Sequence, residues 1–213
     1  MIELNKSKIP TWLQLNQTSK TAEYKLAPAD KKPSPWRADE VVAALKNECA
    51  KKCMYCECII DDAAYSAVEH IKPKHLFEDL VLDWDNLGLA CTRCNTNKGK
   101  YWTDNTDLRL LNPYHDQLAE HIAFRGPLTV AHLHSSRAEN TLRRLKLSTR
   151  EDLVVSRMRR IEDLDVRLRL WHNESDAEKK DLFAEDVIDA ISNNCEFSGV
   201  LRAYAIESGF PIE

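Results

Sequence analysis

The feature that most constrains the fold of this chain is a pair of C-x-x-C motifs, Cys53-x-x-Cys56 and Cys91-x-x-Cys94, separated by 34 residues. A two-residue gap lets both sulfurs of a motif face one point, so two motifs supply four thiolates to a tetrahedral zinc ion. Four protein ligands leave no open coordination position, which predicts a structural site that staples an inserted module. Free buried thiols or a redox pair are the alternatives, and the matched pairs favour zinc.

The composition is typical of a soluble cytoplasmic protein. Of 213 residues, 43% are hydrophobic and 30% are charged, which excludes disorder throughout. No uncharged apolar run approaches the roughly 18–20 residues of a membrane helix, and the N-terminus lacks a signal peptide. In a reducing compartment, clustered cysteines are expected to bind metal instead of forming disulfides. The remaining cysteines, Cys49, Cys58 and Cys195, are expected to be small core residues.

The charge is unevenly distributed. The net charge of −4 argues against a protein that coats nucleic acid non-specifically. Residues 137–169 hold 10 basic and 6 acidic side chains, whereas residues 174–213 hold 3 and 10. This asymmetry indicates a charged ligand or partner, and two solvated helix faces explain it equally well.

The sequence predicts an α+β fold that is mostly helical and has three parts. Residues 1–48 form an N-terminal arm and a helix, residues 49–110 form the zinc-stapled core, and residues 111–213 form a C-terminal helical region. The arm covers residues 1–33, which are polar and lack periodicity, so it wraps the core or binds a partner.

Local signals place the elements within these parts. Ser34 followed by Pro35 predicts a helix start, and the apolar residues that follow support a helix to about Lys52. Short strands are expected at residues 59–60, 65–71 and 87–90. Residues 111–116 are typical of a linker, and the chain is expected to be helical after Ser135.

Two capping boxes, Ser148-x-x-Glu151 and Ser175-x-x-Glu178, predict helix starts in the C-terminal region. Apolar side chains recur every three or four residues after each box. The first stripe is Val154, Met158, Ile161, Leu164, Leu168 and Trp171, and the second is Leu182, Phe183, Val187, Ile188 and Ile191. Packing between core helices is the simpler interpretation, and an interface with another protein is the alternative.

The segment between and just after the cysteine motifs carries the parts of a hydrolytic site. Glu69 and His70 are adjacent, Asn86 lies farther along, and Asn95 directly follows the second motif. A histidine can accept a proton from water near neutral pH, and carboxylate and amide oxygens suit Mg²⁺ or Mn²⁺. Three nearby lysines suit phosphate, namely Lys72, Lys74 and Lys98. Each residue alone has a structural explanation, but together they are the components of metal-assisted phosphodiester hydrolysis.

These residues resemble the HNH endonuclease family. The family pattern is an acidic residue followed by His, a central Asn, and a His or Asn directly after the second C-x-x-C motif. The matching residues are Glu69-His70, Asn86 and Asn95, the last within Cys91-x-x-Cys94-Asn95-x-x-Lys98. The resemblance covers about residues 50–102 and implies a ββα-metal fold, in which a β-hairpin carries the histidine and a helix carries the final ligand.

The resemblance also implies a role for each residue. It makes His70 the general base, and it makes Glu69 and Asn95 the ligands of a catalytic Mg²⁺ or Mn²⁺ ion. Asn86 orients the loop and the imidazole, and Lys98, one helical turn beyond Asn95, contacts phosphate. Lys72 and Lys74 are further candidates for phosphate contact, with solvated lysines as the equal alternative.

Two departures from the family pattern and one geometric tension remain. Asn95 stands where many relatives have His, which favours Mg²⁺ or Mn²⁺ over zinc or nickel. Glu69 stands where many have Asp and reaches one methylene further. Adjacent strand residues point to opposite faces, so the strand must end or bulge near His70, and Pro73 makes that plausible. The other histidines are expected to be structural: His75, His115, His121, His132, His134 and His172.

A looser likeness extends to the PtuB-type HNH proteins of Septu and retron-associated anti-phage systems. The matching segments are Cys53-x-Tyr55-Cys56-Glu57, Glu69-His70-Ile71-x-Pro73-Lys74, Trp84-x-Asn86-Leu87-x-Leu89-Ala90-Cys91 and Leu111-Asn112-Pro113. Those proteins work beside a PtuA-type ABC ATPase. The likeness implies a DNA endonuclease in a defence complex, with the arm and the C-terminal helices contacting the ATPase. The alternatives are a zinc-stapled protein-binding module with an inactive site, and a ribonuclease acting on RNA such as tRNA.

Overall fold

The structure is a computed structural model that describes residues 1–60 and 66–212. Its helices are α1 (Thr11–Leu26), α2 (Asp39–Glu48), α3 (Thr92–Lys98), α4 (Ser136–Leu145), α5 (Glu151–Asn173), α6 (Ala177–Ala190) and α7 (Ser198–Glu207). Its strands are β1 (Ser66–His70), β2 (Leu87–Cys91), β3 (Ile122–Arg125) and β4 (Leu128–Ala131). They form two antiparallel pairs, β1 with β2 and β3 with β4. The fold is therefore α+β and mostly helical, as the sequence predicts.

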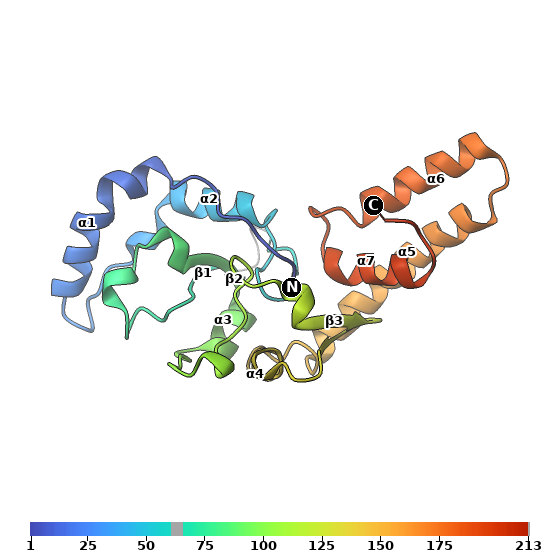
Figure 1. The fold of residues 1–213 in the computed structure, drawn as a ribbon. Helices are drawn as coiled ribbons and strands as arrows, with labels where there is room; N and C mark the ends of the chain where they lie inside the picture. The colour runs from blue at the N-terminus through green and yellow to red at the C-terminus, as the bar shows by residue number, and fades with distance from the viewer. Residues whose placement is uncertain (61–65, 213) are drawn as a thin grey trace.

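Two groups of buried apolar side chains hold these elements together. The larger surrounds the β1–β2 hairpin and includes Leu45 of α2, Leu89 of β2 and Leu145 of α4. The smaller lies among α5, α6 and α7 and includes Leu164 and Val187. Figure 1 shows α1 and α2 at one end of the molecule and α5 to α7 at the other.

No helix in the described part of the chain combines the length and apolarity that crossing a bilayer requires.

The strands flanking the predicted site are confirmed. The segments expected at residues 65–71 and 87–90 form β1 and β2, although Tyr65 lies outside the described residues. The segment at residues 59–60 is not a strand and contributes a single bridge, between Ile59 and Lys52.

The sequence analysis expects residues 1–33 to form an arm without a helix. This expectation is wrong, because residues 11–26 form α1. Only Leu13 and Tyr24 of this helix are buried. With two buried residues, the segment has no apolar side chain every three or four residues. The sequence pattern that predicts a helix is therefore missing. Within the predicted arm, residues 1–10 and 27–33 lie outside helices and strands.

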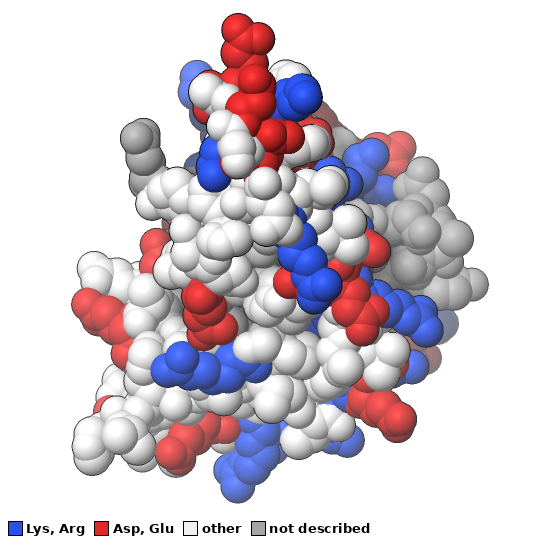
Figure 2. Space-filling view, turned by 90° about the vertical axis from the view of Figure 1, so that its right-hand side faces the viewer, with Lys and Arg blue, Asp and Glu red and all other residues white. Residues whose placement is uncertain are grey.

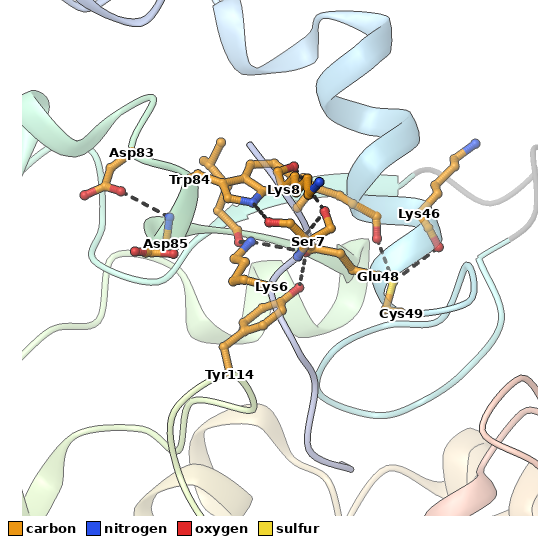
Figure 3. A network of polar contacts seen from close by, with 12 residues as sticks. Lys6, Ser7, Lys8, Lys46, Glu48, Cys49, Asp83, Trp84, Asp85 and Tyr114 are labelled. Atoms are coloured by element: carbon orange, nitrogen blue, oxygen red, sulfur yellow. Dashed lines mark hydrogen bonds and ion pairs between the residues drawn. The ribbon is translucent and has the colours of Figure 1, made fainter. Parts of the chain in front are cut away.

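The N-terminal segment is fastened across the hairpin by a polar network (Figure 3). The ammonium of Lys6 donates to the Leu87 carbonyl at 2.7 Å and pairs with the Glu48 carboxylate at 3.2 Å. It also lies 4.0 Å from the ring centre of Trp84 and 4.3 Å from that of Tyr114. Lys6 is thus one of the polar anchors of this segment, and its cation lies against two aromatic rings.

The helix predicted to run from Pro35 to about Lys52 is shorter in the structure. Pro35–Arg37 forms a single 3-10 turn that places Trp36 in the core, and α2 begins only at Asp39. It ends at Glu48 because the next residues turn away: Ala50 and Lys51 adopt left-handed conformations with φ of 50° and 57°.

Both predicted capping boxes are wrong. The Ser148 hydroxyl donates to the Thr129 carbonyl of β4, and Arg150 occupies the N-cap position of α5. At α6 the cap is Asp176, whose carboxylate accepts from the Lys179 amide at 3.0 Å. Ser148 does not cap α5 because its hydroxyl is bonded to β4. Ser175 does not cap α6 because the next residue, Asp176, is an equally good capping residue and takes that position.

The apolar stripes of α5 and α6 are buried only in part. Leu164 and Val187 lie in the core, whereas Met158, Leu182 and Ile188 are 45%, 61% and 54% exposed. Core packing is therefore confirmed for the buried members, and an interface with another protein stays a prediction for the exposed ones.

A buried carboxylate joins the first cysteine motif to α7. Glu57 accepts hydrogen bonds from the Ser198 hydroxyl at 3.1 Å and the Gly199 amide at 3.0 Å, and it lies 2.5 Å from the Met1 ammonium. Burial acts to raise the pKa of Glu57, but the Met1 ammonium, the Gly199 amide and Lys52 together lower it to about 2. The core that carries the cysteine motifs and the C-terminal helices are therefore connected by this carboxylate as well as by apolar packing.

Replacing Glu57 with glutamine is expected to lower the free energy of unfolding by about 3 kcal/mol at pH 7, because it breaks a buried ion pair. Since the folded-state pKa is lowered, this contribution is complete above the ordinary pKa of 4.5 and is lost as the pH falls toward 2. Urea unfolding followed by circular dichroism measures the change. Glu185→Gln, at an exposed position of α6, is the control, and equal midpoints for the two variants would contradict the prediction.

Candidate functional site

The site is built on a hairpin that leads directly into a short helix. In the antiparallel register Ser66 pairs with Cys91, Glu69 with Gly88 and His70 with Leu87. Cys91 ends β2 and also caps α3, since its sulfur accepts from the Cys94 amide at 3.4 Å. The β–β–helix order that the sequence analysis predicts is therefore present.

The four motif cysteines converge. The sulfurs of Cys53, Cys56, Cys91 and Cys94 all lie within 4.8 Å of one another. Four sulfurs at the usual zinc distance would be separated by about 3.8 Å along each tetrahedral edge, and the Cys56 and Cys91 sulfurs are 3.8 Å apart. The residues present therefore fit a structural zinc ion, as the motifs predict.

Two neighbours of this cluster were missed by the sequence analysis. Cys58, expected to be an ordinary core residue, places its sulfur 3.2 Å from that of Cys56. The Arg150 guanidinium lies 3.4 Å from the Cys94 sulfur. Burial acts to lower the pKa of Arg150, but the cysteine sulfurs raise it overall. A zinc ion with four thiolates carries a net negative charge, which Arg150 is placed to offset. No spacing rule links Arg150 to the motifs, whereas Cys58 could have been suspected from its position two residues after Cys56.

Arg150→Ala is expected to weaken zinc binding by about tenfold or more, because removing an outer-shell partner of a metal site typically has an effect of that size. Competition with a chromogenic zinc chelator measures the affinity. Arg159→Ala, at an exposed position of the same helix, is the matched control. Equal zinc affinity in the two variants would show that Arg150 does not stabilise the cluster.

A cleft of about 670 Å³ brings the predicted catalytic residues together, because Glu69, His70 and Asn95 all line it. Its basic lining residues are Arg37, Lys74, Lys98 and Lys100, and Glu69 is the one acidic residue among its described lining residues. The cleft is thus positive although the chain carries a net charge of −4. The sequence analysis missed Arg37, His75 and Lys100 as lining residues, because Arg37 comes from a distant segment and neither of the others belongs to a motif.

His70 is buried, and its hydrogen bonding determines which ring nitrogen can accept a proton. Nε2 lies 3.0 Å from the Val81 carbonyl, and a carbonyl can only accept, so Nε2 carries the hydrogen and Nδ1 keeps the lone pair. The ring also meets the edge of Trp36, with centres 4.8 Å apart. Burial and the nearby Lys74 lower the pKa of His70 to about 3. The imidazole is therefore neutral and oriented, as a base requires.

Glu69 is also buried and forms an ion pair with the Lys98 ammonium. Lys98 donates in addition to the His70 carbonyl at 2.7 Å, so it joins the end of β1 to α3. Burial raises the pKa of Glu69, and Lys98 opposes that rise. The Lys98 side chain is only 4% exposed, and its predicted contact with phosphate stays a prediction.

The oxygen donors of the cleft fit a hard cation. Mg²⁺ is usually held by one or two carboxylates together with water and substrate phosphate. Glu69 offers a carboxylate and Asn95 an amide oxygen to the same space. Adjacent residues within a strand point to opposite faces, but β1 ends at His70. Glu69 and His70 therefore both line the cleft.

Asn86 holds the loop that follows His70. Its Oδ1 accepts from the Lys72 amide at 2.7 Å, and its Nδ2 donates to the carbonyls of Lys72 and Leu80 at 3.1 and 3.0 Å. Both the oxygen and the nitrogen of the side-chain amide thus bond to the loop backbone. This agrees with the predicted role of Asn86 in orienting the loop after His70. Lys72 itself is exposed, while Lys74 is half-buried and its ammonium lies 4.9 Å from the centre of the Trp36 ring.

Comparison with known proteins agrees with this geometry. Residues 53–101 match the family model described as HNH endonuclease. This segment is an HNH endonuclease domain. The matched range begins at the first zinc-motif cysteine and ends just beyond α3, so the HNH domain contains the cysteine cluster, the hairpin and every residue predicted for catalysis.

Two curated relatives carry the name Septu protein PtuB. The one from Bacillus thuringiensis is 34% identical over 123 residues, covering 57% of this chain and 46% of the relative. The one from Bacillus mycoides is 24% identical over 160 residues, covering 62% and 54%. The chain thus spans about half the length of these relatives.

Proposed function

We propose that this chain is a metal-dependent endonuclease that hydrolyses phosphodiester bonds in DNA as part of an anti-phage defence complex. The observation that carries the proposal is the cleft in which His70, Glu69 and Asn95 meet among four basic side chains. A polyanionic strand is attracted to such a surface, and the neutral imidazole and the oxygen donors supply what hydrolysis needs.

In the proposed reaction His70 takes a proton from the attacking water at Nδ1. The Val81 carbonyl holds Nε2–H, so the ring keeps the tautomer and orientation that this transfer requires. Asn86 contributes indirectly, because it closes the loop directly after His70.

Glu69 and Asn95 hold the catalytic Mg²⁺ or Mn²⁺ ion in this proposal. When bound, the ion stabilises the charge that develops on the phosphate and the leaving oxygen. Lys98 keeps Glu69 in place through the ion pair. Lys74 and Lys100, together with Arg37, draw the phosphate backbone into the cleft.

We further propose an ABC-type, PtuA-like ATPase as the partner, with the C-terminal helices and the N-terminal segment as contact regions. The relatives' names place those proteins in Septu systems, and exposed apolar side chains on α5 and α6 support a contact there. Val166, Leu170 and Leu182 are 60%, 51% and 61% exposed. Figure 2 looks onto this end of the molecule, where uncharged residues lie among acidic and basic ones. We propose a cytoplasmic location as well, because the described cysteines form no disulfide and four of them are placed as metal ligands.

The test is incubation of the purified chain, alone and with the ATPase, with plasmid DNA, tRNA and Mg²⁺ or Mn²⁺. Metal-dependent nicking or cutting of the plasmid is the expected result, and it should be lost when the divalent metal is omitted. Cleavage of tRNA alone would select the ribonuclease alternative. Absence of cleavage under every condition, with the ATPase still bound, would select the inactive binding module.

A further inference from the structure

A second pocket lies beside the catalytic cleft and plays no part in the proposed chemistry. Its volume is about 210 Å³, below the roughly 300–1,000 Å³ of pockets that enclose drug-sized ligands. Aromatic and aliphatic residues form much of its lining, among them Tyr101, Trp102, Ile71 and Leu111. We call it the aromatic pocket. A space of this size with such walls suits one small planar group.

Two cations of this pocket lie over the ring of Trp102. The Arg109 guanidinium is 5.2 Å from the centre of the Trp102 ring, and the Lys72 ammonium is 5.9 Å from it. Trp102 is half-exposed, and its ring meets the edge of Phe77 with centres 5.1 Å apart. An aromatic ring flanked by Arg and Lys is the combination that binds a nucleobase by stacking and its phosphate by charge.

The wall of the pocket opposite the hairpin is rigid. Arg137 of α4 forms two hydrogen bonds with the Asp116 carboxylate, at 2.8 and 2.6 Å. It also donates to the carbonyls of Arg109 and Leu110 at 3.3 and 3.1 Å. The loop that contains Leu111-Asn112-Pro113, which the sequence analysis noted without a function, is thereby fixed to α4. The pocket is formed before any ligand arrives.

The aromatic pocket adjoins the catalytic cleft. Lys98 lines both spaces, and Ile71 and Lys72 directly follow His70 in the chain. A strand whose scissile phosphate lies at His70 therefore has a neighbouring nucleotide within reach of the pocket. A base can enter a pocket of this size only when it has left its stack, as in single strands, loops and flipped nucleotides.

We propose that the aromatic pocket binds one unpaired nucleobase next to the scissile phosphate, with Trp102 as the stacking residue. The inference rests on the proposed nuclease function and deepens it, because it makes an unpaired nucleotide part of the preferred substrate. Arg109 and Lys72 bind the phosphate of that nucleotide.

The test measures binding without cleavage, in the 213-residue chain that carries His70→Gln. Fluorescence anisotropy with a labelled single-stranded oligonucleotide and with the same sequence in a fully paired duplex compares Trp102→Ala with Trp102→Phe. Trp102→Ala is expected to weaken single-strand binding by about tenfold, from the usual size of one base–aromatic stack, and duplex binding by less than about twofold. Trp102→Phe retains a ring and is expected to stay close to the parent in both.

Equal losses of single-strand and duplex affinity in Trp102→Ala, or no loss in either, would overturn the proposal. So would a Trp102→Phe variant as weak as Trp102→Ala at an unchanged melting temperature. Because the readout is binding, a chain that cleaves neither plasmid nor tRNA still reveals whether the pocket binds an unpaired base. Failure of the catalytic proposal and failure of this one are therefore distinguishable.

Discussion

Replacing Cys91 with serine is expected to release zinc and unfold the HNH domain. Zinc binding to a structural site contributes about 10–16 kcal/mol in small zinc domains, whereas a whole domain is stable by only about 5–15 kcal/mol. Cys91 also ends β2 and caps α3, so its loss affects the elements that carry His70 and Asn95. Zinc content by mass spectrometry and thermal unfolding by circular dichroism measure the result.

Two further variants make this experiment decisive. Cys195→Ser is the control, because its thiol lies outside the cluster. The thiol donates to the Asp189 carbonyl at 3.1 Å and lies 3.5 Å from the Ser192 hydroxyl, contacts that serine can also form. The sulfur of Cys58 lies beside the cluster and could replace a lost ligand. If Cys91→Ser retains zinc, the double variant with Cys58→Ser is expected to lose it. Zinc retained by the double variant would contradict a four-cysteine site.

Replacing His70 with alanine is expected to reduce the rate of DNA cleavage by about 10²- to 10⁴-fold, the usual contribution of a positioned general base. The matched control is His132→Ala, since His132 is exposed and lies outside the cleft. Initial rates of plasmid nicking at saturating Mg²⁺ or Mn²⁺ give the ratio. A His70→Ala rate within about twofold of the control would rule out His70 as the base.

A second substitution separates catalysis from folding, because His70 is buried and alanine leaves the Val81 carbonyl without its hydrogen bond. His70→Gln can still donate to that carbonyl but cannot act as a base, so it is expected to fold and to be as inactive as His70→Ala.

The lowered pKa of His70, about 3, keeps the imidazole neutral at pH 5–8. The cleavage rate is therefore expected not to fall as the pH drops through about 6.5, the ordinary histidine value.

Much of the HNH domain could be predicted from short-range sequence features. The cysteine spacing specifies that two sulfurs face one point, and the strand segments before and after Asn86 are apolar enough to be recognised. Glu69 and His70 are neighbours in the chain, so their shared location follows once the strand is placed. The structure agrees on each of these points because each depends on residues that are close in sequence.

Features that depend on partners distant in sequence were missed. The sequence analysis could not see that Lys98 pairs with Glu69, because nothing in a seven-residue helix indicates which of its faces meets β1. It assigned serine caps to α5 and α6, where contact with β4 or a neighbouring aspartate decided otherwise. It could not find α1, whose two buried residues form no stripe.

By itself, the sequence determined the cysteine cluster, the hairpin and the short helix, and the convergence of Glu69, His70 and Asn95. These follow from local spacing and from the chemistry of individual side chains. Only the tertiary structure decided how positive the cleft is, which nitrogen of His70 is free, and that an aromatic pocket adjoins it. Arg37, Val81, Arg109 and Arg137 come from separate segments of the chain. Their contributions exist only after burial of the apolar core has brought those segments together.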